Sequence, residues 1–370
     1  MTTPTILFQP PNHVGLGHIN RLSAIALALR QIDPEIRAPF AVEGAAHVLL
    51  DALDLPYVPL PSTHLMQENK YWSSWTEGER AGLSVSVARA VLASVDPQLV
   101  VFDCFPNQGF LSAVLERQVP MALCIREMRN LDKYLEEVSD LLPRVSLILV
   151  PHDAGTFDLP EALNAKSRFV GRVMKPVKLI QKEEKRNPNC LRVVVSGGGG
   201  GYPGTFKFYN LAMRAVSELR QSYPKLEART VVGPLFRDWS LLEPMNGISM
   251  IPFDPDPFAT FASADLVISV AGYNTVTELQ CVGTRTILLP AERLWDDQFS
   301  RAERTARMYP HFRIFRGSSH MDLANVARGF LTEPVPTARM SVPDGGSKAA
   351  WCLRSMIKKH LRLAERQPNQ

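Results

Sequence analysis

The 370-residue sequence has few cysteines, no long hydrophobic run and little net charge, and each of these absences excludes a class of protein. Its five cysteines are an odd number without a CxxC spacing, which predicts neither a disulfide framework nor a structural zinc site. We therefore expect a reducing, cytoplasmic environment. No stretch approaches the roughly 20 apolar residues that span a bilayer, and the opening MTTPTILFQPP has no basic segment before an apolar run. The sequence predicts a protein that is soluble or, at most, in peripheral contact with a membrane.

The charge balance argues against nucleic acid as a partner. Lys and Arg number 41 and Asp and Glu 37, which gives a formal charge of +4 that is dispersed along the chain. Trp72 and Trp75 are interpreted as packing or acceptor-side surface, because no basic groove accompanies them as a base-stacking platform would require. With 45% hydrophobic and 21% charged residues the chain is globular, and its length favours two domains of about 150 residues each.

Short apolar runs alternate with helical patterns through both halves of the chain, which is typical of α/β sheets. In the first half, strands are expected at residues 5–8, 38–42, 99–102 and 147–150, and helices at 19–30 and 82–94. In the second half, strands are expected at 191–195, 229–232, 248–252, 266–269 and 286–290, and a helix at 205–220. The alternation predicts two doubly wound, Rossmann-like domains.

Changes of composition set the expected boundaries. The N-terminal domain covers 1–168, a polar connection rich in proline and lysine covers 169–190, and the C-terminal domain covers 191–346. Residues 347–370 form a C-terminal helix and tail, with Ser347 placed to cap the helix. The apolar spacing of this helix is compatible with docking on either domain.

The first candidate site is the loop HisValGlyLeuGlyHis at 13–18, between the first expected strand and the first expected helix. Gly15 and Gly17 let the backbone approach a ligand, and a helix N-terminus favours negative charge. A dinucleotide-binding fingerprint would need a third glycine where Asn20 or Arg21 stands, so the spacing excludes that kind of site.

A histidine at the C-terminal end of a strand is well placed for general-base catalysis, and His18 is the candidate. His13 competes for the role. The alternative interpretation of His18 is a structural histidine that caps the loop.

The second candidate site is SerGlyGlyGlyGlyGly at 196–201, again between an expected strand and an expected helix. Several backbone N–H groups of such a loop can converge on a phosphate. No Lys-Ser/Thr pair follows, so this is not a Walker A loop. A flexible linker is the alternative, but linkers do not normally join a buried strand to a helix.

The third candidate site follows the strand at 266–269. A helix is expected to start near Thr275, with Glu278 on its first turn. The two oxygens of a carboxylate match the adjacent hydroxyls of a ribose, and helix-start electrostatics is the alternative role for Glu278.

Asp254 and Asp256 have the DxD spacing with which two carboxylates can hold a divalent metal. Prolines surround the pair and a helix follows, so turn formation and helix capping explain it more simply. We expect no metal site.

Together these motifs resemble those of the GT-B glycosyltransferases, in particular the family of the peptidoglycan N-acetylglucosaminyltransferase and related bacterial nucleotide-sugar transferases. The resemblance implies two Rossmann-like domains that face a central cleft. It also implies inverting, metal-independent sugar transfer from a nucleotide diphosphate sugar, a UDP-sugar, to an acceptor hydroxyl, with His18 as base and no cofactor besides the donor. It places the donor diphosphate and ribose on Gly197, Gly198, Gly199, Gly200, Gly272, Thr275 and Glu278, the nucleobase near Phe253, and the donor sugar near Asp297 and Gln298.

Two other functions stay open at this point. A nucleotide-sugar hydrolase of the same architecture would use the same histidine to activate water, and a catalytically silent sugar-nucleotide-binding subunit would bind without turnover. The acceptor is also open, because His13, Val14 and Leu16 stand where small residues are common in the family.

Overall fold

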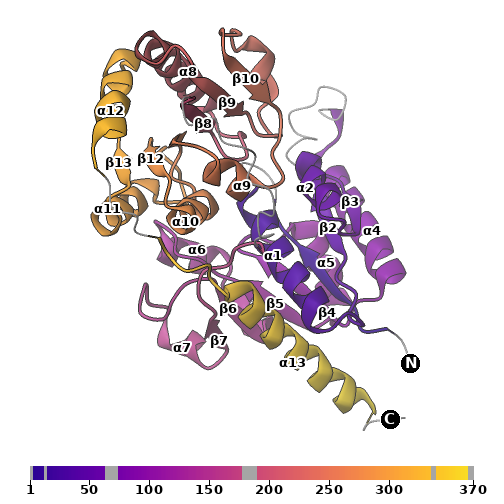
Figure 1. The fold of residues 1–370 in the computed structure, drawn as a ribbon. Helices are drawn as coiled ribbons and strands as arrows, with labels where there is room; N and C mark the ends of the chain where they lie inside the picture. Colours follow the sequence, from indigo (N-terminus) through magenta and orange to yellow (C-terminus); the bar gives the residue numbers. More distant parts are fainter. Residues whose placement is uncertain (1–2, 12–14, 63–73, 177–189, 335–338, 366–370) are drawn as a thin grey trace. The chain divides into compact units, whose positions relative to one another are not determined.

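The computed structural model describes residues 3–11, 15–62, 74–176, 190–334 and 339–365 (Figure 1). The chain divides into two compact units, one formed by Met1–His13, His18–Pro176 and Pro343–Gln370 and the other by Val14–Gly17 and Val177–Val342. Each unit is built on one parallel sheet with intervening helices, so the expected α/β class with two Rossmann-like sheets is confirmed. Most of the expected connection, residues 177–189, lies outside the described residues.

The first unit has a seven-stranded sheet of order β3-β2-β1-β4-β5-β6-β7. Its strands are β1 (Ile6–Gln9), β2 (Phe40–Glu43), β3 (Tyr57–Leu60), β4 (Leu99–Asp103), β5 (Met121–Cys124), β6 (Leu147–Val150) and β7 (Ser167–Phe169). Its helices include α1 (Gly17–Ile32), α2 (His47–Ala52), α4 (Glu77–Val95), α5 (Gln108–Glu116), α6 (Leu131–Glu137) and α7 (Glu161–Asn164). Every residue of β1 and β4 is buried, as expected for central parallel strands covered on both faces.

The second unit has a six-stranded sheet of order β10-β9-β8-β11-β12-β13. Its strands are β8 (Arg192–Ser196), β9 (Glu227–Val231), β10 (Ile248–Ile251), β11 (Leu266–Ser269), β12 (Arg285–Leu288) and β13 (Phe312–Ile314). Its helices include α8 (Thr205–Ser222), α9 (Pro257–Ala262), α10 (Tyr273–Val282), α11 (Gln298–Met308) and α12 (His320–Thr332). Successive residues of β8 point to opposite faces: Val193 and Val195 pack with α8 and α12, and Val194 packs with α9, α10 and α11.

The C-terminal helix α13 (Gly345–Glu365) belongs to the first unit. Arg354 Nε and Lys358 Nζ each lie 2.7 Å from Asp33 Oδ2, just beyond the end of α1. These ion pairs settle the docking that the apolar spacing left open. The helix begins two residues earlier than expected, so Ser347 lies in its first turn and does not cap it.

Among the strands of the described residues, β3, β5, β7 and β13 were not predicted. The four-residue strand β5 is fully buried but follows a proline and has no alternation, so its sequence does not distinguish strand from helix. Helix α4 begins at Glu77, earlier than the expected 82, because Thr76 and Glu79 form a capping box. No helix in the described part of the chain has the length and apolarity needed to cross a bilayer.

Candidate active site

In each sheet the strand order reverses at one pair of neighbouring strands, and polar groups gather at the carboxyl ends of both pairs. The pair is β1 and β4 in the first unit and β8 and β11 in the second. In the second unit the two strand ends are joined, because Ser269 Oγ donates a hydrogen bond of 2.8 Å to the Ser196 carbonyl. Open α/β sheets bind ligands at such reversal points. The fold therefore singles out two places for function.

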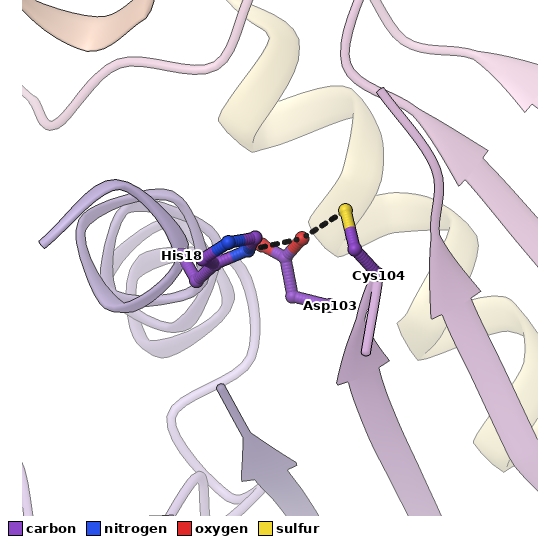
Figure 2. Close-up of side chains that lie close together, drawn as sticks. All are labelled: His18, Asp103 and Cys104. Atoms are coloured by element: carbon purple, nitrogen blue, oxygen red, sulfur yellow. Dashed lines mark hydrogen bonds and ion pairs between the residues drawn. The ribbon is translucent and has the colours of Figure 1, made fainter. Parts of the chain in front are cut away.

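In the first unit, Asp103 at the end of β4 is buried and holds His18 from the start of α1 (Figure 2). The distance between His18 Nδ1 and Asp103 Oδ1 is 3.1 Å. Arg21, one helical turn beyond His18, donates from Nε to Oδ2 and from Nη2 to Oδ1, both at 2.9 Å. Arg21 is only 2% exposed, so the guanidinium and the carboxylate form a buried bidentate pair.

The electrostatics of this cluster leave His18 neutral and Asp103 charged. Burial alone would raise the pKa of the Asp103 carboxyl, but Arg21 and His18 together hold it well below its ordinary value. Burial lowers the pKa of His18, and the attraction of Asp103 only partly opposes this. Since the carboxylate can only accept, Nδ1 of the neutral imidazole carries the proton and Nε2 carries a lone pair. The side chain of His18 is 23% exposed, and Nε2 has no partner among the described residues.

His18, Asp103 and Cys104 also form the one group in the described residues with the number and proximity of ligand atoms for a metal ion (Figure 2). Their chemistry does not suit a cation. Both Asp103 oxygens accept from Arg21, and Cys104 Sγ donates to Oδ1 at 3.2 Å. Burial raises the pKa of the Cys104 thiol to about 12, so at neutral pH it is not the thiolate that binds metals.

Asp103 is the functional residue that the sequence analysis missed. A signal for it exists, because it ends a buried strand whose neighbour leads into the His18 loop, but sequence alone does not show that β1 and β4 are neighbours. Gly17 is the first residue of α1 and Gly15 lies in the loop before it. The competing His13 and the Trp72 of the tryptophan pair lie outside the described residues.

In the second unit, the glycine loop (residues 197–201) leaves β8 with backbone angles that favour glycine. Gly198 and Gly200 have φ of +67° and +80°, which L side chains rarely adopt. A Cβ on Gly200 would also lie 2.8 Å from the Val232 carbonyl oxygen. The conformation of this loop therefore requires glycine at these two positions, which a flexible linker would not.

The buried Tyr209 on α8 supports the beginning of the glycine loop. Gly197 N–H donates to Tyr209 Oη at 2.9 Å, and the hydroxyl lies 2.6 Å from the carbonyls of Val231 and Val232. A Cβ on Gly197 would stand 2.4 Å from that hydroxyl. The Gly197 amide is thus engaged by the protein. The Gly198 N–H makes only a long contact of 3.5 Å with Ser196 Oγ, so the amides from Gly198 onward are the ones that can serve a ligand.

Helix α10 begins at Tyr273, with Gly272 as its N-cap, and this corrects the expected position of Glu278. Thr275 lies on the first turn, but Glu278 lies on the second and is 4% exposed. The favourable interaction of a carboxylate with a helix N-terminus falls off within the first turn, so it does not explain the presence of Glu278 on the second turn.

Comparisons with known proteins agree with this architecture. Residues 207–307 match the model of the glycosyltransferase family 28 C-terminal domain. The chain is similar to the family 28 glycosyltransferases over this region, and its two-sheet α/β architecture is the fold of the GT-B glycosyltransferases.

Two curated relatives are UDP-N-acetylglucosamine--N-acetylmuramyl-(pentapeptide) pyrophosphoryl-undecaprenol N-acetylglucosamine transferases. The one from Rhodopseudomonas palustris strain HaA2 is 26% identical over 77% of this chain and 78% of its own length. The one from Halorhodospira halophila is 30% identical over 39% of this chain, which spans only 41% of that relative.

Two solved structures share the fold. Acinetobacter baumannii MurG has a TM-score of 0.56 and 16% identity, covering 96% of this chain and 99% of its own. A putative UDP-N-acetylglucosamine 2-epimerase from Listeria monocytogenes has a TM-score of 0.60 and 14% identity, covering 98% and 97%. At these identities the likeness establishes the fold alone, and the reaction must be argued from the site.

Asp297 and Gln298 make hydrogen bonds where the segment that follows β12 joins α11. Asp297 caps α11 by accepting from Ser300 N at 3.0 Å. Gln298 is 3% exposed, accepts from Ala291 N at 3.0 Å and contacts Asp296 Oδ2 at 3.3 Å. The side chain of Gln298 therefore shapes the loop that the resemblance assigns to the donor sugar.

The DxD pattern is a turn, as expected. Asp254 Oδ1 accepts from Asp256 N at 2.9 Å, and Asp256 is the N-cap of α9. Phe253 immediately precedes this turn, after the end of β10. Its place beyond a strand end fits the nucleobase role that the resemblance implies, which stays a prediction.

Proposed function

We propose that this chain is a glycosyltransferase that moves a sugar from a nucleotide diphosphate sugar to the hydroxyl of an acceptor. The observation that carries the proposal is the His18 imidazole, held by buried Asp103 at the strand-order reversal with Nε2 unpartnered among the described residues. Support for a UDP-sugar comes from the curated relatives, whose names specify UDP-N-acetylglucosamine.

His18 acts as the general base. Its Nε2 takes the proton of the acceptor hydroxyl, and Asp103 stabilises the imidazolium that results. The acceptor oxygen forms a bond to the anomeric carbon while the bond from that carbon to the diphosphate oxygen breaks, and the diphosphate leaves with the electron pair. In-line attack inverts the anomeric configuration.

The second unit binds the donor. The amides of Gly198, Gly199 and Gly200 and the N-terminus of α10 face negative charge on the diphosphate, and Glu278 accepts from the ribose hydroxyls. Backbone amides and a helix N-terminus supply the positive potential that a divalent cation supplies elsewhere, so the proposed mechanism is metal-independent. The pyrophosphoryl-undecaprenol in the names of the relatives supports peripheral membrane contact as part of the same proposal. The cysteines without a disulfide spacing support a cytoplasmic location.

A donor screen followed by product analysis tests the proposal. Nucleoside diphosphate sugars are titrated by calorimetry, and the bound one is incubated with and without a panel of hydroxyl acceptors. Transfer predicts a glycoside only with acceptor, whereas a hydrolase releases free sugar in both reactions and a silent binding subunit releases none. Activity is expected to survive EDTA, and a loss that Mg²⁺ or Mn²⁺ restores would contradict the metal-independent mechanism.

A further inference from the structure

Arg293 occupies an unusual position in the segment between β12 and α11. Its guanidinium carbon lies 3.8 Å from the centroid of the Tyr202 ring, a close cation–π stack. Tyr202 is 7% exposed and directly follows Gly201, the last residue of the glycine loop. Since the ring is fixed by burial, the stack holds the Arg293 cation next to the end of that loop.

The two stacked residues come from segments that leave the same edge of the sheet. In the strand order, β11 separates β8 from β12. Parallel strands bring their carboxyl ends to one edge, so the segment that carries Arg293 and the glycine loop emerge on either side of the end of β11.

The guanidinium of Arg293 has no hydrogen-bond or ion-pair partner among the described residues. Asp296, three residues further along the chain, attracts this guanidinium electrostatically but is not paired with it. The ion pair of Asp296 is with the buried Arg301, whose Nη2 lies 2.6 Å from Asp296 Oδ1. Burial lowers the pKa of Arg293, although a guanidinium remains protonated at neutral pH. A half-buried cation without a directly paired carboxylate is costly, and an anionic ligand in contact with it would relieve that cost.

We propose that Arg293 binds the diphosphate of the donor and opposes the negative charge that develops on it during transfer. The inference rests on the proposed function and deepens it, because it adds a side-chain cation to the backbone amides of the glycine loop. A planar guanidinium presents paired N–H donors that match phosphate oxygens, and stacking on Tyr202 reduces the freedom lost on binding. The site therefore selects donors with a diphosphate leaving group.

Titration with a series of ligands that differ only in phosphate tests this role. Wild type, Arg293→Ala and Arg293→Lys are titrated by calorimetry with UDP, UMP and uridine. Removing a charge-assisted hydrogen bond is expected to weaken UDP binding about ten- to a hundredfold in Arg293→Ala and to leave uridine binding unchanged. The UDP affinity of Arg293→Lys should lie between those of the wild type and Arg293→Ala, since lysine keeps the charge but lacks the planar guanidinium.

The matched control is Arg307→Ala on α11, which removes an equal charge from the same unit at a side chain that is 77% exposed. It should bind UDP as the wild type does. Thermal unfolding midpoints of all variants show whether each is folded at the temperature of titration.

The outcomes separate the two proposals. If wild type binds UDP and Arg293→Ala binds it equally well, the role of Arg293 is overturned and the proposed function stands. An equal loss for uridine and UDP would also overturn it, because the variant would then act through the shape of the site. If wild type binds none of UDP, ADP, GDP and dTDP, the nucleotide diphosphate donor itself is wrong and both proposals fall.

Discussion

At the strand-order reversal of the first sheet the polar groups are side chains, whereas at that of the second sheet they are mainly backbone groups. His18, Asp103 and Arg21 form a hydrogen-bonded cluster in which burial lowers the pKa of His18 below its ordinary value. The glycine loop offers amides, and their charge does not change with pH. Under the proposed function, one topology supplies acid–base chemistry in one unit and anion binding in the other, and the predictions below test that separation.

The largest effect is expected from His18→Ala. Loss of the general base should lower turnover by roughly a hundred- to ten-thousandfold, while the affinity for UDP changes little because the donor groups lie in the other unit. Steady-state rates and calorimetric UDP titration are measured on the same preparation. The control is His360→Ala on α13 of the same unit, which should keep the turnover rate and the UDP affinity of the wild type. If His18→Ala stays folded and turns over at the wild-type rate, the first unit does not supply the general base.

Gly200→Ala is expected to weaken donor binding and the second unit together. The new Cβ meets the Val232 carbonyl oxygen at 2.8 Å in a residue with φ of +80°, so the loop must move at a cost of about 1 to 3 kcal/mol. Urea unfolding and UDP titration measure the two effects.

Gly155→Ala is the control for Gly200→Ala, because it separates the effect of backbone strain from that of steric crowding. Gly155 in the first unit has φ of +81° with nothing within 4 Å of a Cβ. It should lose stability from strain alone and leave UDP binding intact. Equal UDP affinities for both alanine variants would show that the glycine loop is not the anion site.

Glu278→Ala tests the ribose contact. A charge-assisted hydrogen bond is worth about 1.5 to 3 kcal/mol, so UDP affinity should fall by that amount while the affinity for deoxy-UDP falls much less. Glu278→Gln keeps the shape of the side chain and should lose part of the discrimination. If Glu278→Ala still distinguishes ribose from deoxyribose as the wild type does, this buried carboxylate supports α10 and does not bind the ligand.

The smallest effect concerns pH. A base is active when unprotonated, and burial lowers the pKa of His18 below its ordinary 6.5. More than half of the histidine is then neutral at pH 6.5, so kcat/KM there should remain above half of its value at pH 8. The residual activity of His18→Ala should lose this acid limb. A midpoint above pH 6.5 would mean that Asp103 outweighs burial in the folded enzyme.

Much of the fold could be predicted because its signals are local. Buried strands such as β4 and β11 are continuous apolar runs, and the glycine loop is five consecutive letters of sequence. Strand β5 was missed, and the first turn of helix α10 was misplaced. Their limits depend on capping and on neighbouring strands, which short sequence windows do not contain.

The candidate site was only half determined by sequence. Position after the first strand identified His18, but its partner Asp103 is 85 residues away, and the contact exists because β1 and β4 are neighbours in the sheet. Likewise Arg293 and Tyr202 are joined only through strand order. Local patterns fix which residues form strands, turns and loops, because those depend on backbone preference and burial. Pairing of distant charges depends on the order in which the strands assemble, and tertiary structure alone decided it.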